Sequence, residues 1–385
     1  MAKRIYLDYA ATTPVDKRVV KAMEPYLSEK FGNTMSLHSF GQEAKFALDQ
    51  SRQVLADLIN AEPNEIVFTG SATESNNLAL KGIAFANKNK GNHIIISAIE
   101  HACIIESAKW LQKQGFEITK LLVDKNGFVN PEDIEKAITD KTILVSVMHA
   151  SNEIGTIEPI TKIGEICRKK GVYFHTDASQ TLGKIQIDVK KMNIDLLTAS
   201  SHKMYGPKSV ALLYIREGVK IEPILHGGGQ ENGFRSSTVN IPGIVGFAKA
   251  AEICKAEMKV EGKRLAKLRD KLIKGILKIN GARLNGSPKE RLPNNINVSF
   301  PRIEGESLII RLDLEGIACS TGSACSSIKL EPSYVLLAIG LKPEEAHGSL
   351  RITLGRQTTE KDINYILKVL PKVVKQLELM SPFKG

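Results

Sequence analysis

The chain has 385 residues, of which 42% are hydrophobic and 25% charged, a composition typical of soluble globular proteins with a large core. No apolar run approaches the roughly 18 residues of a membrane span, so we expect a cytoplasmic protein with no membrane segment. The net charge of +11 favours anionic ligands. Lysine and arginine are nevertheless dispersed and only 5% of residues are aromatic, so direct binding of nucleic acid is not expected.

Short runs rich in valine and isoleucine alternate with segments of helical period between residues 65 and 215. The expected strands are Glu65–Thr69, His93–Ser97, Ile118–Val123, Ile143–His149, Val172–Asp177, Leu196–Ser200 and Val210–Ile215. Helices are expected between several of them, such as Ala102–Gln114 and Ile160–Lys170. This alternation predicts an α/β fold whose large domain has a mostly parallel seven-stranded sheet covered by helices. Ligands of such sheets bind at the carboxyl ends of the strands.

The pattern changes after Pro242, where a long charged amphipathic segment runs to about Ile279. The elements expected after it are the extended stretch Asn294–Ser299, the helix Glu306–Leu314, the strands Gly316–Cys319 and Leu350–Leu354, and a helix from Glu360. These elements predict a smaller C-terminal α+β domain. We assign residues 13–250 to the large domain, and residues 1–12 and 251–385 to the small domain, which carries a loop at about 320–333 rich in serine, glycine and alanine.

Three segments that follow expected strands carry residues suited to one chemistry. Lys203 precedes a Gly-Pro break and could form a Schiff base, although a lysine in a turn is ordinarily solvated. Asp177 ends the preceding strand and could pair with a protonated pyridine nitrogen, or simply cap the strand. The small and hydroxyl residues of Thr69–Asn77 open a helix and suit a phosphate group, as they would any capped helix start.

Further polar residues occur at similar positions. His101 could stack on a planar ring or shuttle protons, although a lone histidine is more often a structural hydrogen-bonding group. Asn152 and Gln180 are neutral amides that could bind a ring oxygen or a substrate carboxylate. Arg351 alternates with apolar neighbours and suits bidentate binding of a carboxylate, with a structural salt bridge as the alternative.

The five cysteines are widely spaced without a CxxC pair, so neither a disulfide framework nor a metal site is indicated. Cys325 lies among small polar residues, and we expect it on an exposed, mobile loop where a thiol can reach both an internal site and an external partner. Cys319 ends an expected strand and fits a buried position. The remaining cysteines lie in helical patterns and are interpreted as structural: Cys103, Cys167 and Cys254.

Taken together, these segments resemble the cysteine desulfurases of the NifS/IscS type, within the class V aminotransferase family of fold type I pyridoxal-phosphate enzymes. The matching stretches keep the family's order and cover nearly the whole chain: Tyr6–Pro14, Thr69–Asn77, Glu100–His101, Asn152–Gly155, His175–Gln180, Ser201–Pro207, Gly227–Glu231, Arg235–Thr238, Ser320–Val335 and Leu350–Thr359. The chain departs from the family at Thr34 and Met35, where Pro-Ser is common, and at Ser209 and Ser237, where glycine is usual.

The resemblance implies that the large domain binds pyridoxal 5'-phosphate. Lys203 would form the Schiff base with it, Asp177 would pair with the pyridine nitrogen and His101 would stack on the ring. The other contacts implied are Asn152 and Gln180 near the ring oxygen, and Ala72, Thr73, Ser200 and His202 at the phosphate. Thr238 would reach the phosphate of the neighbouring subunit's cofactor, so the resemblance also implies a homodimer.

The implied activity is the conversion of L-cysteine to L-alanine, with the sulfur left as a persulfide on Cys325. Asn152 and Arg351 would hold the substrate carboxylate and Lys203 would move the α-proton. The sulfur acceptor is expected to be a protein such as an iron–sulfur cluster scaffold. The alternatives are a sulfur donor for tRNA thiolation, a selenocysteine lyase, an aminotransferase of the same fold, and a non-catalytic scaffold that retains the fold.

Overall fold

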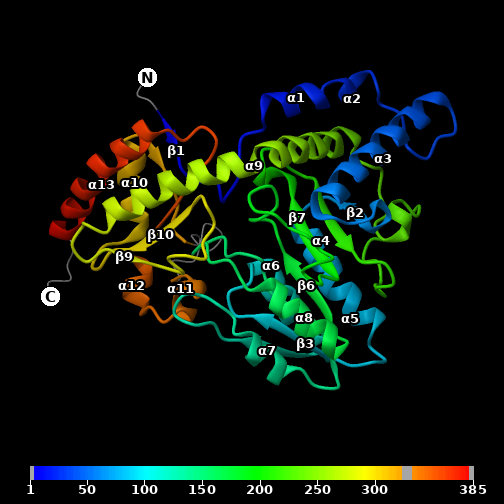
Figure 1. Ribbon diagram of the computed structural model, residues 1–385, viewed down its shortest axis with the longest axis horizontal. Helices are drawn as coiled ribbons and strands as arrows, with labels where there is room; N and C mark the ends of the chain where they lie inside the picture. The colour runs from blue at the N-terminus through cyan, green and yellow to red at the C-terminus, as the bar shows by residue number, and fades with distance from the viewer. Residues whose placement is uncertain (1–3, 323–331, 381–385) are drawn as a thin grey trace.

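The computed structural model describes residues 4–322 and 332–380 (Figure 1). Its main feature is a sheet of seven strands in the order β2 (Ile66–Thr69), β8 (Ala211–Ile215), β7 (Leu196–Ser200), β6 (Tyr173–Asp177), β5 (Thr142–Ser146), β3 (His93–Ser97) and β4 (Glu117–Leu121). Strand β8 is antiparallel to both of its neighbours, and the remaining pairs are parallel. The predicted α/β class with a mostly parallel seven-stranded sheet is therefore confirmed.

Helices cover both faces of this sheet. Successive residues along a strand point to opposite faces, and they accordingly belong to different apolar clusters. Phe68, Leu197 and Leu212 belong to one cluster, whereas their chain neighbours Val67 and Leu196 belong to another. The helices before and between the strands are α1 (Lys17–Met23), α2 (Pro25–Ser28), α3 (Ser39–Ile59), α4 (Ala72–Asn77), α5 (Ile83–Ala86), α6 (Ala102–Lys113), α7 (Pro131–Ala137) and α8 (Ile160–Lys170). Across the described residues, no helix is both long and apolar enough to cross a membrane.

The C-terminal part contains a small antiparallel sheet in the order β12 (Ser349–Thr353), β10 (Asn295–Ser299), β9 (Arg283–Leu284). A parallel pair joins β1 (Ile5–Tyr6) to β11 (Ile317–Ala318), so the start of the described chain packs here. The accompanying helices are α10 (Gly305–Leu314), α11 (Tyr334–Ala338), α12 (Pro343–His347) and α13 (Glu360–Met380). Ile5 and Leu7 share an apolar cluster with residues of β10, β12 and α13.

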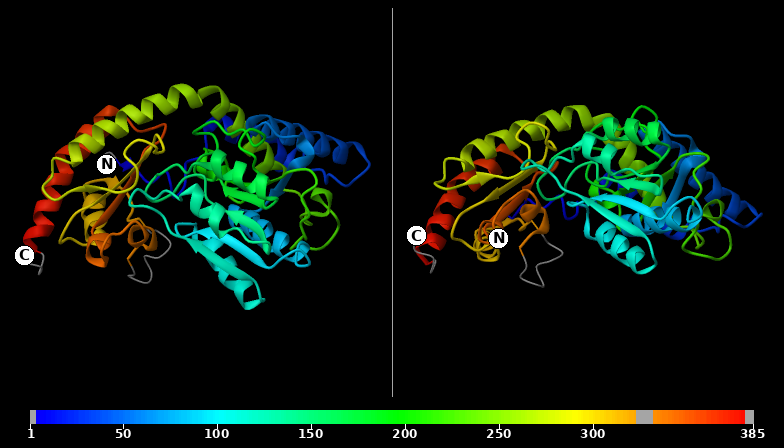
Figure 2. Two further views of the ribbon diagram at one scale, coloured as in Figure 1. Left: turned by 60° about the horizontal axis from the view of Figure 1, so that its bottom comes forward. Right: turned by 90° about the horizontal axis from the view of Figure 1, so that it is seen from below.

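Helix α9 (Ile241–Ile276) connects the two parts (Figures 1 and 2). Its buried residues from Ile241 to Cys254 lie on the side of the large domain, where the helix packs on α3 and α1, whereas those from Leu265 to Ile276 belong to the C-terminal cluster. We propose that these separate clusters are the physical basis of two domains. The boundary that we placed at residues 250 and 251 falls inside this continuous helix.

The topology brings the candidate residues to one edge of the sheet. Strands β3, β5, β6 and β7 are parallel, so their carboxyl ends lie at the same edge. The segments that follow those ends carry His101, Asn152, Asp177 and Lys203. A further apolar cluster packs Ile99 and other residues near this edge against α11 and α12, which brings the C-terminal part over it.

Candidate active site

A cavity of about 470 Å³ lies at this edge of the sheet. Ten of the residues predicted from the sequence line it: Ala72, Thr73, His101, Asn152, Asp177, Gln180, Ser200, His202, Lys203 and Arg351. Thr238 is exposed and does not line the cavity. Cys325 lies outside the described residues, although Gly322 and Tyr334 on either side of that gap are both in the lining.

Lys203 stands in a single 3₁₀ turn, Ser201–Lys203, directly after β7. Its Nζ donates hydrogen bonds to the backbone oxygens of Ala10, at 2.5 Å, and Ala11, at 2.8 Å. The N-terminal segment therefore orients the lysine amine at the cavity wall.

Asp177 is the last residue of β6 and is held by two donors. Its Oδ2 accepts from Nδ2 of Asn76 at 2.7 Å, and its Oδ1 accepts from the backbone N–H of Ser179 at 2.9 Å. Asn76 also lines the cavity, and its own Oδ1 is buried without a hydrogen-bond partner among the described residues. Sequence reasoning missed this residue, although it lies within the expected phosphate-binding stretch.

Burial lowers the pKa of three imidazoles in this part of the large domain. For His101, the negative charge of Asp177 opposes this effect and the positive charge of Lys203 adds to it. Burial also lowers the pKa of His202 and of His175 to about 4. The neutral imidazole is therefore favoured at all three positions.

The start of α4 provides a lining of small residues. Ser71 caps the helix by accepting from the backbone N–H of Glu74 at 3.1 Å, and Gly70 N–H donates to the Glu74 carboxylate at 2.9 Å. Glu74 is fixed by Arg235, whose Nε lies 2.7 Å from Oε1. The backbone and hydroxyl of Thr73, together with the helix N-terminus, suit an anionic group.

Arg351 reaches the cavity from β12. Its Nη2 lies 2.8 Å from Oδ1 of Asp8, and its Nη1 donates to the backbone oxygens of Asn152, at 3.4 Å, and Gly322, at 3.5 Å. The salt bridge that we considered as an alternative is therefore present. The guanidinium still lines the cavity, and its buried Nε has no partner among the described residues. Asp8 was not expected, because nothing in the local pattern links it to Arg351.

Comparison with known proteins places this arrangement in a family. Residues 5–366 match the class-V aminotransferase family. The chain belongs to that family. It is 55% identical to "Cysteine desulfurase IscS" of Clostridium botulinum over 99% of this chain and 97% of that protein. It is 54% identical to "Cysteine desulfurase IscS" of Methanosarcina thermophila over 99% of this chain and 94% of that protein.

Solved structures agree with this assignment. A "NifS-like protein" superposes with a TM-score of 0.92 at 40% identity, covering 97% of this chain and 100% of that one. A structure described as "SspA in complex with cysteine" superposes with a TM-score of 0.82 at 38% identity, covering 91% of this chain and 98% of that one. The family's fold therefore extends over nearly the whole chain.

One departure from the family's usual sequence has a visible backbone consequence. Ser209 stands where the family usually has glycine, and it has a φ of 59°. That is the left-handed region that glycine adopts without cost. Ser209 therefore occupies a backbone conformation that favours glycine, and it also lines the cavity.

The described cysteines are unsuited to act as nucleophiles. Burial raises the pKa of Cys103, Cys167 and Cys319 to about 12, and it also raises the pKa of Cys254. All four thiols are therefore protonated at neutral pH, and the reactive species of a cysteine is the thiolate.

Two contacts at the rim of the cavity were missed by sequence reasoning. Glu153 is buried, and its Oε2 accepts from the hydroxyl of Ser333 at 2.5 Å. Burial raises the pKa of Glu153 to about 7. The hydroxyl of Tyr334 donates to the backbone oxygen of Glu100 at 2.6 Å. The sequence signal for these contacts was only that the residues fall in the matched stretches Glu100–His101, Asn152–Gly155 and Ser320–Val335, which does not show that they pair.

Proposed function

We propose that this chain is a pyridoxal-phosphate-dependent cysteine desulfurase that converts L-cysteine to L-alanine and leaves the sulfur on Cys325. The observation that carries the proposal is the convergence of Lys203, Asp177 and His101 on one cavity. The relatives named as cysteine desulfurases, which match along almost the entire chain, support it.

The residues present fit the cofactor. Pyridoxal phosphate has an aldehyde, a pyridine nitrogen, a ring oxygen and a phosphate. Lys203 offers an amine, Asp177 a carboxyl group oriented by two hydrogen bonds, and Asn152 and Gln180 neutral amides. The phosphate would lie at the start of α4, where Thr73 and its neighbours line the cavity. Once bound, the cofactor supplies an electron sink for the charge that develops at the substrate Cα.

The residues of the chain hold the substrate and move its protons. Arg351 and Asn152 would bind the carboxylate of L-cysteine, which places the substrate Cα near the lysine. The amine of Lys203 would then take the proton from Cα. His101, neutral because of its burial, would pack on the cofactor ring without adding positive charge to it.

Sulfur transfer requires a thiolate, and Cys325 is the residue that we propose for it. Its sulfur would attack the substrate sulfur to form an S–S bond, while the substrate Cβ–S bond breaks and its electron pair returns to carbon. Protonation of that carbon, together with return of a proton from Lys203 to Cα, gives L-alanine. The raised pKa values of the four described cysteines support this choice by elimination.

We further propose that the enzyme is a cytoplasmic homodimer that supplies sulfur to an iron–sulfur cluster scaffold. Thr238 is exposed outside its own subunit's cavity, which suits a contact with the cofactor phosphate of a partner subunit. An exposed apolar surface near α2 and α3 also supports association. It comprises Leu27, Phe31, Met35, Leu37, Phe40 and Phe46.

The test is a single turnover with L-cysteine in the absence of reductant. Alanine is quantified and persulfide is mapped by mass spectrometry in the wild type, in Cys325→Ser and in Cys319→Ser as the matched control. We expect stoichiometric alanine with persulfide on Cys325 in the wild type and the control, and loss of the persulfide in Cys325→Ser. Alanine without persulfide would refute the sulfur-transfer step. Full turnover by Lys203→Ala would refute the role of the lysine.

Two further measurements separate the remaining alternatives. A selenocysteine lyase would release selenium from L-selenocysteine but little sulfur from L-cysteine. A sulfur donor for tRNA thiolation would pass persulfide sulfur to a tRNA-modifying partner faster than to a cluster scaffold. We expect turnover of L-cysteine and faster transfer to the scaffold.

A further inference from the structure

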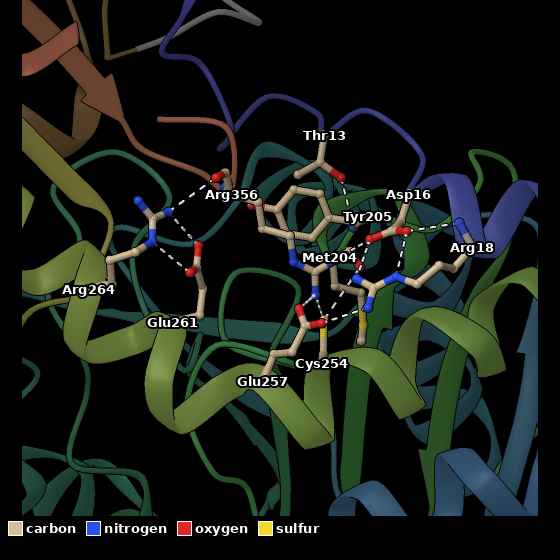
Figure 3. Close-up of polar contacts among 10 residues, drawn as sticks. All are labelled: Thr13, Asp16, Arg18, Met204, Tyr205, Cys254, Glu257, Glu261, Arg264 and Arg356. Atoms are coloured by element: carbon tan, nitrogen blue, oxygen red, sulfur yellow. Dashed lines mark hydrogen bonds and ion pairs between the residues drawn. The ribbon is translucent and has the colours of Figure 1, made fainter. Parts of the chain in front are cut away.

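The turn that carries Lys203 is held by the N-terminal segment (Figure 3). The backbone N–H and the hydroxyl of Thr13 both donate to the backbone oxygen of His202, at 3.0 and 2.9 Å. The hydroxyl of Thr13 also accepts from the backbone N–H of Tyr205 at 2.8 Å. Asp16 N–H donates to the backbone oxygen of Tyr205 at 3.0 Å. Hydrogen bonds therefore fix the backbone on both sides of the lysine.

Tyr205 has an unusual backbone conformation. Its φ is 66°, in the left-handed region that residues with a side chain rarely adopt. Such a conformation persists only where the surroundings determine it. Tyr205 lies two residues after Lys203, so a relaxation of its backbone would change the path of the turn and move the lysine amine.

Arg356 contacts the Tyr205 side chain in two ways. Its guanidinium carbon lies 4.2 Å from the centre of the tyrosine ring, and its backbone N–H donates to the tyrosine hydroxyl at 2.9 Å. The same guanidinium reaches Asp16, at 2.8 Å, and Glu257 on α9, at 3.1 Å. Arg356 thus joins the tyrosine to the N-terminal segment and to α9.

The backbone around Arg356 is itself anchored to α9. Nη1 of Arg264 donates to the backbone oxygen of Thr358 at 2.7 Å, and its Nη2 donates to that of Gly355 at 3.1 Å. Glu261, three residues before Arg264 on the helix, pairs with the same guanidinium at 2.7 Å. The position of Arg356 is consequently determined by a rigid helix.

We propose that Arg356 is a positioning residue for Lys203, because it holds Tyr205 in the left-handed conformation that sets the turn. This inference rests on the proposed function, in which the lysine binds the cofactor and moves the substrate proton. Arg356 lies behind the turn and does not line the active-site cavity, so it acts through Tyr205.

Arg18 provides a matched control (Figure 3). It pairs with the same two carboxylates as Arg356, Asp16 at 2.8 Å and Glu257 at 2.7 Å. Its side chain is 52% exposed, whereas that of Arg356 is 17% exposed. Within the described part of the chain, no polar or cation–π contact joins Arg18 to Tyr205. Loss of Arg18 therefore removes its own ion pairs with these two carboxylates but leaves the contacts between Arg356 and Tyr205 in place.

The experiment compares Arg356→Gln, Arg356→Lys and Arg18→Gln in the cofactor-loaded enzyme. The first readout is the midpoint of the pH-dependent change in absorbance of the lysine-bound cofactor. This midpoint reports the environment of the lysine nitrogen independently of turnover. The second is the separation of kcat from KM for L-cysteine. We expect Arg356→Gln to shift the midpoint and to lower kcat roughly tenfold to hundredfold with little change in KM, since small displacements of a reacting group have effects of this size.

The controls decide between positioning and general destabilisation. Arg18→Gln should match the wild type in both readouts. Arg356→Lys, which keeps the charge but not the planar stacking group, should fall between Arg356→Gln and the wild type, and it provides the test if the glutamine variant does not fold. A wild-type midpoint and kcat in the Arg356 variants, or equal effects in Arg18→Gln, would overturn the proposal. A wild-type enzyme that binds the cofactor but makes no alanine from L-cysteine would refute the proposed function instead, and the absorbance midpoint would still test Arg356.

Discussion

Glu231 and Arg52 form a buried ion pair whose loss should be costly. Their side chains are 3% and 12% exposed, and Nη2 of Arg52 lies 2.7 Å from Oε1 of Glu231. Oε2 accepts both from Nη1 of Arg52 and from the backbone N–H of Phe68, each at 2.8 Å. The pair also fixes a turn in which Glu231 and Asn232 have φ values of 50° and 56°.

Glu231→Gln keeps the shape of the side chain but cannot satisfy these donors. In either orientation of the amide, its NH₂ group faces an N–H of Arg52, and the guanidinium loses its counter-charge. Breaking a buried pair by removing one partner costs about 3–5 kcal/mol. We therefore expect the melting temperature of the variant to fall by roughly 4–6 °C.

Calorimetry on the cofactor-loaded enzyme measures this effect, and Glu62→Gln is the control. Glu62 pairs with Lys190 at the same distance of 2.7 Å, but both side chains are more than half exposed. Such a pair is worth about 0–1 kcal/mol, so the control should melt close to the wild type. A melting temperature of Glu231→Gln within about 2 °C of the wild type would show that the buried pair is not stabilising and would refute the reasoning.

Three further changes test other contacts. In Glu153→Gln, the pH dependence of stability should change: burial raises the folded-state pKa from 4.5 to about 7, so the wild type loses stability as pH rises through that range. Between pH 5 and 8.5, the free energy of unfolding of the variant, measured with urea, should rise by about 2 kcal/mol relative to that of the wild type. Parallel curves of unfolding free energy against pH for the two proteins would contradict this. In Gly355→Ala, the new Cβ would lie 2.1 Å from the buried ring of Tyr9, so unfolding should become easier by about 1–3 kcal/mol, and an unchanged urea midpoint would contradict the clash. Asp177→Asn should lower kcat roughly 100-fold or more in the alanine assay, and near-normal turnover would exclude pairing with the ring nitrogen.

Local patterns were sufficient to predict most elements of the large sheet. The strands His93–Ser97 and Leu196–Ser200 and the helix Ile160–Lys170 have the predicted bounds. These segments combine a continuous apolar run or a clear helical period with strong breaks, such as Gly171 at the end of the helix. The strand predicted at Ile118–Val123 instead spans Glu117–Leu121, because this strand at the sheet edge is partly exposed and its apolar pattern is weaker.

Contacts between distant segments could not be predicted in this way. The sequence pattern indicated Arg351 at the site, but its pairing with Asp8 joins β12 to the N-terminal segment, and these meet only in the folded chain. The hydrogen bond between Ser333 and Glu153 has the same character. Side-chain pairing of this kind depends on the relative position of the two parts of the chain, which has no local signal.

The chemistry that the site can perform and the accuracy with which its residues are positioned depend on different contacts. His101, Asn152, Asp177 and Lys203 lie at or after the ends of parallel strands, so the topology of the large sheet brings them together, whereas Arg351 comes from β12 of the small antiparallel sheet. Their orientation depends on the first residues of the chain: Ala10 accepts from Lys203, and Asp8 pairs with Arg351. The segment that contains Ala10 and Asp8 also packs in the C-terminal part through Leu7. A shift of the C-terminal part would therefore be transmitted to the lysine and to the arginine together, which couples the two ends of the substrate site.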